Sequence, residues 1–132
     1  MSTTARRRAH GFGLRAESAA AWALRLKGYR VLERRFRSPV GEIDLIARRG
    51  DVVAFVEVKA RRKAPAEAGE VLSVAQRRRV VQAARAWLAG PRARKLPQSG
   101  TSLRFDVILV SPGAWPRHVA GAWTADSVGL HP

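Results

Sequence analysis

Residues 41–61 have the sequence GEIDLIARRGDVVAFVEVKAR, in which two apolar segments are joined by a short polar one. We predict strands at Glu42–Ala47 and Val52–Lys59, because the residues between them, Arg48–Asp51, have the length and the glycine of a hairpin turn. A further strand is expected just before them, at Tyr29–Arg34. Together the three strands predict an antiparallel meander.

Charged side chains interrupt this otherwise apolar hairpin. The two-residue period of a strand places Glu42 and Asp44 on one face of the first strand, and Glu57 and Lys59 on one face of the second. Burying unpaired charge is costly, so these residues need either partners or a function. From the residues alone two interpretations stay open: a salt-bridge cluster at the end of a hairpin, or a site for chemistry.

The segments on either side predict two helices and two more strands. The stretch Gly13–Lys27 is rich in Ala and Leu, contains no Pro, and is followed by Gly28, which suits a helix C-cap. A second helix is expected at Val71–Ala89, where apolar residues recur with the helical period. Strands are then expected at Arg104–Val110 and around His118–Trp123, so the predicted order is αβββαββ.

The chain has the size of one domain with one sizeable core. We expect residues 1–10 to be a flexible basic arm, residues 11–126 to be the domain, and residues 127–132 to be a C-terminal tail. The segment Pro91–Ser102, which contains prolines, glycine and basic residues, predicts a mobile loop.

Charge and amino-acid composition favour some classes of protein and exclude others. A formal charge of +15, from 25 basic and 10 acidic residues, attracts polyanions, and nucleic acid is the expected partner. The absence of Cys excludes disulfides and thiolate metal sites, and the three scattered His argue against a zinc hydrolase. No apolar run approaches the roughly 20 residues of a membrane span, and the first ten residues lack a signal-peptide core. We therefore expect a cytoplasmic protein with no membrane partner.

The hairpin resembles a known motif. Gly41–Ile46 together with Phe55–Arg61 is similar to the PD-(D/E)xK nuclease motif, and the chain from about Gly11 to Asp126 resembles the YraN-like family. Three further segments carry that resemblance: Ala16–Ala20, Arg104–Val107 and Gly121–Trp123. The YraN-like proteins in turn resemble archaeal Holliday-junction resolvases. This resemblance implies a restriction-endonuclease-like α/β fold, a mixed sheet flanked by helices with the site at one sheet edge.

The resemblance also implies an activity, metal-dependent hydrolysis of DNA, with branched or flapped DNA as candidate substrates. Asp44, Glu57 and the Val58 carbonyl would hold Mg²⁺ or Mn²⁺, which prefer oxygen ligands and activate water. Lys59 would orient the attacking water or stabilise the negative charge that develops on the phosphate. The alternatives are a noncatalytic DNA-binding or repair-accessory module with this fold, and an RNA-associated basic protein.

Two more residues are candidates for the site. Glu17 faces the side of the first helix that packs on the sheet, and it either binds the metal through water or is a first-turn carboxylate favoured by the helix dipole. The resemblance favours the metal role. Gln76 lies on the inward face of the second helix, where YraN-like proteins usually have Lys, and its role is open. Asp106, in contrast, is expected to satisfy a neighbouring backbone group or Arg104.

Two basic runs suit contact with phosphate and give affinity without sequence readout, although either could be only a solvated face. We predict that they bind DNA rather than RNA; the residues are Arg61, Arg62, Lys63, Arg77, Arg78 and Arg79. Cutting both strands of a junction needs two sites, which a homodimer would supply. Val119 and Trp123 could form its self-complementary patch, or they could be core residues.

Overall fold

The computed structural model describes residues 3–61, 72–97 and 100–128. Its elements, in chain order, are α1 (Thr3–Leu26), β1 (Arg30–Ser38), β2 (Gly41–Arg49), β3 (Val52–Ala60), α2 (Val74–Leu88), the 3-10 helix η2 (Ala93–Lys95), β4 (Ser102–Val110), β5 (Arg117–Trp123) and the 3-10 helix η3 (Ala125–Val128). Apart from the two short 3-10 helices, this order is the predicted αβββαββ.

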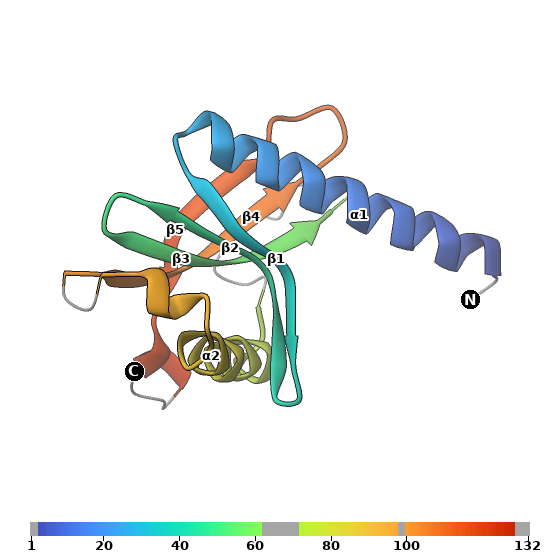
Figure 1. Cartoon of the computed structure of the whole chain (residues 1–132). Helices are drawn as coiled ribbons and strands as arrows, with labels where there is room; N and C mark the ends of the chain where they lie inside the picture. The colour runs from blue at the N-terminus through green and yellow to red at the C-terminus, as the bar shows by residue number, and fades with distance from the viewer. Residues whose placement is uncertain (1–2, 62–71, 98–99, 129–132) are drawn as a thin grey trace.

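The strands form one mixed sheet in the order β1-β2-β3-β4-β5. Neighbouring strands are antiparallel except β3 and β4, which are parallel and are connected through α2 (Figure 1). A parallel pair needs such a crossover, because the chain must return to the same end of the sheet. The predicted meander of β1, β2 and β3 is confirmed, and the architecture is consistent with the restriction-endonuclease-like fold.

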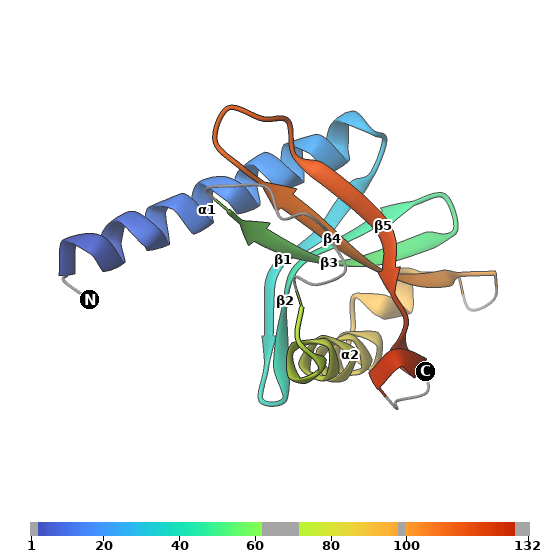
Figure 2. The same ribbon diagram turned by 180° about the vertical axis from the view of Figure 1, so that it is seen from behind.

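The two helices cover opposite faces of the sheet (Figures 1 and 2). β3 contributes side chains to the cores on both faces, because alternate residues of a strand point in opposite directions. Val53 and Phe55 belong to the core under α2, where the rings of Phe55 and Trp87 meet edge to face with centroids 6.0 Å apart. Ala54 and Val56 belong to the core under α1. β3 is therefore buried on both sides over Val53–Val56. Glu57 follows this buried segment directly, so the sheet fixes its backbone position.

Helix α1 begins at Thr3, not at Gly13, so the predicted start was wrong. Most of the segment that we expected to be a flexible arm is helical, because Ala and Arg favour helix, and Gly11 and Gly13, which follow the arm, cost only about 1 kcal/mol each. The division into arm, domain and tail stays a prediction. The C-terminal end is as predicted: Gly28 has a φ of 90°, and the Tyr29 N–H donates to the Leu24 carbonyl at 3.0 Å.

Two other expectations concern the second half of the chain. The segment predicted as a loop, Pro91–Ser102, contains η2, and residues 98–99 lie outside the described residues.

Trp123 is a core residue, since it is 7% exposed and stacks on Phe105 with ring centroids 4.3 Å apart. It therefore does not form an exposed patch with Val119, and the predicted homodimer would need another surface.

Among the described residues, no helix combines the length and the apolar character needed to cross a membrane. α1 has 24 residues, which is long enough, but its sequence is interrupted by several arginines.

Candidate functional site

The candidate site lies where β2 leaves β3. The β2–β3 ladder runs from Leu45, opposite Val56, to Arg49, opposite Val52, and goes no further toward the start of β2. Pairing of β2 with β1, in contrast, continues to Gly41, opposite Ser38. Residues 41–44 therefore form a two-stranded extension with β1, which reaches past the sheet to α2 (Figure 1).

Asp44 is the residue at the point of divergence. The Val58 N–H donates to Asp44 Oδ2 at 2.7 Å, so the side chain of Asp44 accepts the hydrogen bond that a ladder would give to a backbone carbonyl. Ile43 belongs to the core under α2 and Leu45 to the core under α1, although the two residues are two positions apart. The strict alternation used to predict side-chain directions is thus interrupted around Asp44.

The extension touches α2 through a glycine. A Cβ atom on Gly41 would lie 2.2 Å from the carbonyl oxygen of Arg79, far inside van der Waals contact. Only glycine permits this approach of two backbones. As a result the tip of the β1–β2 hairpin rests directly on the first half of α2 and closes one side of a cavity.

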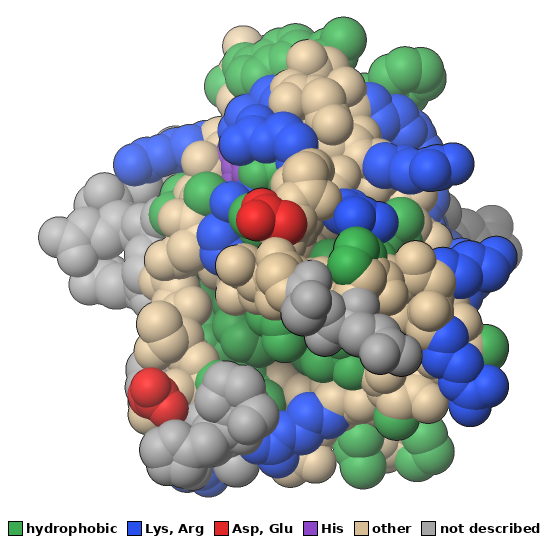
Figure 3. All heavy atoms as spheres, turned by 60° about the vertical axis from the view of Figure 1, so that its left-hand side comes forward, with side chains coloured by type: hydrophobic (Ala, Val, Ile, Leu, Met, Phe, Trp, Pro, Cys, Tyr) green, Lys and Arg blue, Asp and Glu red, His purple; other side chains and the backbone are tan. Residues whose placement is uncertain are grey.

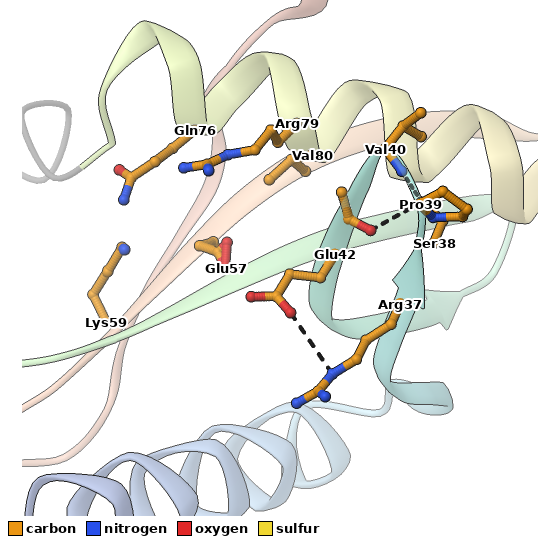
Figure 4. Close-up of a pocket in the computed structure, with 11 residues that line it drawn as sticks. Arg37, Ser38, Pro39, Val40, Glu42, Glu57, Lys59, Gln76, Arg79 and Val80 are labelled. Atoms are coloured by element: carbon orange, nitrogen blue, oxygen red, sulfur yellow. Dashed lines mark hydrogen bonds and ion pairs between the residues drawn. The ribbon is translucent and has the colours of Figure 1, made fainter. Parts of the chain in front are cut away.

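That cavity has a volume of about 460 Å³ and is bounded by the hairpin tip, β3 and α2. Its polar lining comes from three directions (Figure 4): Glu57 and Lys59 from β3, Arg37 and Glu42 from the hairpin, and Gln76 and Arg79 from α2. The predicted proximity of Glu57 and Lys59 is confirmed. The cavity contains both charge signs, and an ion pair of 3.7 Å joins Arg37 Nε to Glu42 Oε2.

Glu57 and Asp44 form a carboxyl pair beside this cavity. Burial is the largest cause that raises the pKa of Glu57, and a side-chain hydrogen bond with Asp44 and the charge of Asp44 raise it further, to about 9. The positive charge of Lys59 lowers this pKa, and the charge of Glu42 raises it slightly. A pKa this high favours the protonated form of Glu57 at neutral pH, as expected for a half-buried carboxyl group beside a second one.

The donor set of this pair fits a hard divalent cation. Mg²⁺ is commonly held by one or two carboxylates and keeps several waters, so Asp44 and Glu57 are a sufficient protein contribution. Such an ion would neutralise the negative charge that the pair carries once Glu57 has released its proton. No cluster of three Asp, Glu, His or Cys side chains suited to an ion occurs in the described part of the chain, so water would complete the coordination. The ligand role of the Val58 carbonyl stays a prediction.

Glu17 lies in the middle of α1, with 7% of its surface exposed. Since the helix begins at Thr3, the first-turn interpretation of Glu17 was wrong. Its two oxygens are engaged separately: Arg34 Nε donates to Oε1 at 3.2 Å and Arg35 Nε donates to Oε2 at 2.7 Å. Its water-mediated contact with a metal stays a prediction.

Gln76 has a defined structural role. It forms a capping box with Ser73: the Gln76 N–H donates to Ser73 Oγ at 3.2 Å, and the Ser73 N–H donates to Gln76 Oε1 at 3.0 Å. These bonds satisfy backbone donors at the start of α2. The Gln76 side chain nevertheless lines the cavity opposite Lys59 (Figure 4).

The structure describes only some residues of the two predicted basic runs. Arg61 is exposed and its N–H donates to the Val110 carbonyl at 2.9 Å, whereas Arg62 and Lys63 lie outside the described residues. Arg78 and Arg79 are exposed on α2 and Arg77 is half-buried. On the face shown in Figure 3, basic side chains are scattered over the surface and outnumber the acidic ones.

Sequence reasoning missed the arginines of β1. We ended this strand at Arg34, but it continues to Ser38, and this continuation carries Arg35 beside Glu17 and Arg37 into the cavity. A signal was present: Phe36 is an apolar residue between charged ones, and it packs against the core under α2. It could have extended the strand.

Asp106 has the structural role that we expected. It is fully buried and accepts hydrogen bonds from Arg104 at 2.8 Å and from the Gly121 N–H at 2.9 Å, and it lies 2.7 Å from His118 Nε2. Burial, the largest effect, raises the pKa of Asp106, but the bonds from Arg104, His118 and Gly121 together outweigh it and lower that pKa to about 2.

A family of known proteins matches most of this chain. Residues 16–110 match the model of a family described as "Uncharacterised protein family UPF0102". A UPF0102 protein of Chelativorans sp. (strain BNC1) is 51% identical over 120 residues, which are 91% of this chain and 93% of the relative. A UPF0102 protein of Methylorubrum populi is 53% identical over 121 residues, 90% of this chain and 92% of the relative. The matched span contains the whole cavity.

Proposed function

This chain belongs to the UPF0102 family, and we propose that it is a metal-dependent nuclease that hydrolyses phosphodiester bonds in DNA. The observation that carries the proposal is the half-buried carboxyl pair of Asp44 and Glu57, placed beside Lys59 at an open cavity. Such a pair is costly to the fold, and perturbed carboxyl groups in a cleft are typical of functional sites. The charge of +15 supports a polyanionic substrate.

In this proposal Asp44 and Glu57 hold Mg²⁺ or Mn²⁺. When bound, the ion makes a coordinated water more acidic and neutralises the charge that develops on the phosphate. Glu57 must release its proton to become a ligand, because only the carboxylate form binds a cation. Asp44 is kept in place by the Val58 N–H, so one of its oxygens is positioned before any ligand arrives.

Lys59 and the cavity arginines act on the phosphate. The ammonium group of Lys59 projects into the cavity on the same side of β3 as Glu57, where it can donate to an attacking water or to a phosphate oxygen (Figure 4). Arg37 and Arg79 lie on opposite walls of the cavity and attract the substrate. These groups would place a phosphodiester between β3 and α2.

A second candidate function is DNA binding without cleavage, in a repair-accessory role. Two observations favour it. Gln76 occupies the cavity wall where related proteins are expected to have Lys, and its amide oxygen is engaged by Ser73. Within the described residues, moreover, no third acidic or imidazole ligand joins Asp44 and Glu57.

A cleavage assay separates the two functions. Linear, flapped and four-way DNA, with matched RNA, would be incubated with Mg²⁺ or Mn²⁺ and with EDTA. We expect metal-dependent cleavage of DNA that Lys59→Ala abolishes while binding stays nearly intact. Lys95→Ala is the matched control, since it removes the same charge from an exposed position on η2. Binding without cleavage of any substrate would establish the second function, and wild-type cleavage by Lys59→Ala would refute the assigned role of Lys59.

A further inference from the structure

β1 contains an unusual backbone conformation next to the site. Arg35 has a φ of 52°, and no other residue in the described part of the chain, apart from glycines, has a positive φ. Residues with a Cβ adopt this left-handed region at an energetic cost, and such conformations concentrate at functional sites. A strand interior gives no local reason for it.

The consequence of this conformation is that two consecutive arginines reach the same carboxylate. In a regular strand, Arg34 and Arg35 would point to opposite faces of the sheet. Here Arg34 lies 3.2 Å from Glu17 Oε1 and Arg35 lies 2.7 Å from Glu17 Oε2. Arg34 Nη2 also donates to Ser18 Oγ at 3.1 Å. The left-handed conformation of Arg35 thus brings two arginines of β1 together beside α1.

Neutralising Glu17 does not explain the second arginine. One guanidinium is enough to compensate the buried carboxylate, and the pair leaves the cluster with an excess positive charge. The arginine side chains are 41% and 43% exposed, whereas the side chain of Glu17 is 9% exposed. A guanidinium has five N–H donors, so each arginine keeps donors for an anion that arrives from solvent.

The backbone of the arginine pair lies next to the strand that carries Asp44. Arg34 is opposite Leu45 and Phe36 is opposite Ile43 in the β1–β2 ladder, which places Arg35 across from Asp44. Arg34 and Arg35 do not line the cavity themselves, but Arg37, two residues further along β1, does. Phosphates that follow β1 out of the cavity would therefore meet Arg37 first and Arg35 next. A single isolated anion would find the same donors, but the further cations at the cavity, Arg37 and Arg79, favour a polymer with several phosphates.

We propose that Arg34 and Arg35, held by Glu17, form a binding site for a backbone phosphate of nucleic acid next to the cavity. The inference rests on the proposed function and adds to it a second contact with the substrate. Planar guanidinium groups match the geometry of phosphate oxygens and bind them with paired hydrogen bonds. Glu17 is then a positioning residue that orients both cations.

The test measures DNA binding in EDTA, so that cleavage plays no part. Fluorescence anisotropy with labelled single-stranded and duplex oligonucleotides would be followed over a series of salt concentrations. Arg35→Gly relieves the strained backbone and removes the cation, so we expect it to fold with an unchanged or higher Tm. It should weaken binding several-fold and lower the salt slope by about one unit. Arg30→Gln, an exposed change on the same strand, is the control and should weaken binding less than twofold.

For Glu17→Gln, the proposed site and simple electrostatics predict opposite changes in DNA affinity. It raises the net charge by one, so attraction alone would tighten binding, whereas loss of positioning weakens it. Weaker binding by a folded Glu17→Gln protein supports the inference. Tighter or unchanged binding overturns it, as does an Arg35→Gly protein that binds like the Arg30→Gln control. A wild-type protein that binds no nucleic acid would instead overturn the DNA substrate of the proposed function, and with it this site.

Discussion

Replacing Glu57 with glutamine should stabilise the metal-free protein while it abolishes cleavage. The pKa of Glu57 rises from 4.5 to about 9 in the fold, through burial and through the side chain and charge of Asp44. Between these values the folded protein holds a proton that the unfolded chain has lost. The free energy of unfolding therefore falls by about 1.4 kcal/mol for each pH unit above 4.5. Glutamine keeps a hydrogen-bond donor for Asp44 and has no proton to lose.

The size of the expected stabilisation follows from the difference between the pKa of Glu57 in the folded protein and in the unfolded chain. At pH 5 the wild-type protein has lost little stability, so Glu57→Gln should gain less than about 1 kcal/mol. At pH 7 the gain should reach about 3 kcal/mol, because the interval above the unfolded pKa is larger. The assay is urea denaturation of both proteins in EDTA at pH 5, 7 and 8. Asp51→Asn, an acid-to-amide change in the exposed β2–β3 turn, is the control and should show no such pH dependence.

A constant stability difference between Glu57→Gln and wild type across this pH range would refute the reasoning. It would mean that Glu57 is ionised in the metal-free fold and that Asp44 and Glu57 are not a proton-sharing pair. Addition of Mg²⁺ gives a further check: it should raise the stability of the wild-type protein and leave Glu57→Gln unchanged, because binding to the folded state alone is stabilising.

Three further predictions follow from other contacts. Asp106→Asn should lower the free energy of unfolding by at least about 2 kcal/mol at pH 7 in chemical denaturation. The contribution of the Asp106 carboxylate is present above pH 3.8 and is lost as the pH falls toward about 2, so wild type and variant should converge there. Gly41→Ala should lower stability by about 1–3 kcal/mol and reduce DNA cleavage, because its Cβ would displace the hairpin from Arg79. An active enzyme that cuts both strands of a junction should be a dimer in light scattering; a strict monomer with and without DNA would exclude paired sites.

The spacing of apolar residues along the sequence predicted those helices and strands whose apolar side chains are buried. α2 was expected at Val71–Ala89 and is found at Val74–Leu88, because its apolar residues follow the helical period. The hairpin was predicted from its turn, and the shared face of Glu57 and Lys59 followed from the regular pairing of β3. These features arise from short-range patterns that one sequence contains.

The rest of the site arises from departures from regular structure. The divergence of β2 depends on Asp44 accepting a hydrogen bond from Val58, a contact between two strands that no local pattern specifies. The left-handed conformation of Arg35 goes together with a contact to Glu17, which lies on another element. The N-terminal end of α1 was missed for a different reason: the arginine run and the low apolar content of residues 1–10 indicated a flexible arm, although Ala and Arg are good helix formers.

The arginines of β1 have one more consequence, for solubility. β1 is an edge strand of the sheet, and an edge presents unpaired backbone groups on which a strand of another molecule can add. Arg30, Arg34, Arg35 and Arg37 place a row of positive charge along this edge, so the edges of two copies repel each other. Replacing several of these arginines at once would remove that repulsion, and we expect such a protein to aggregate through β1.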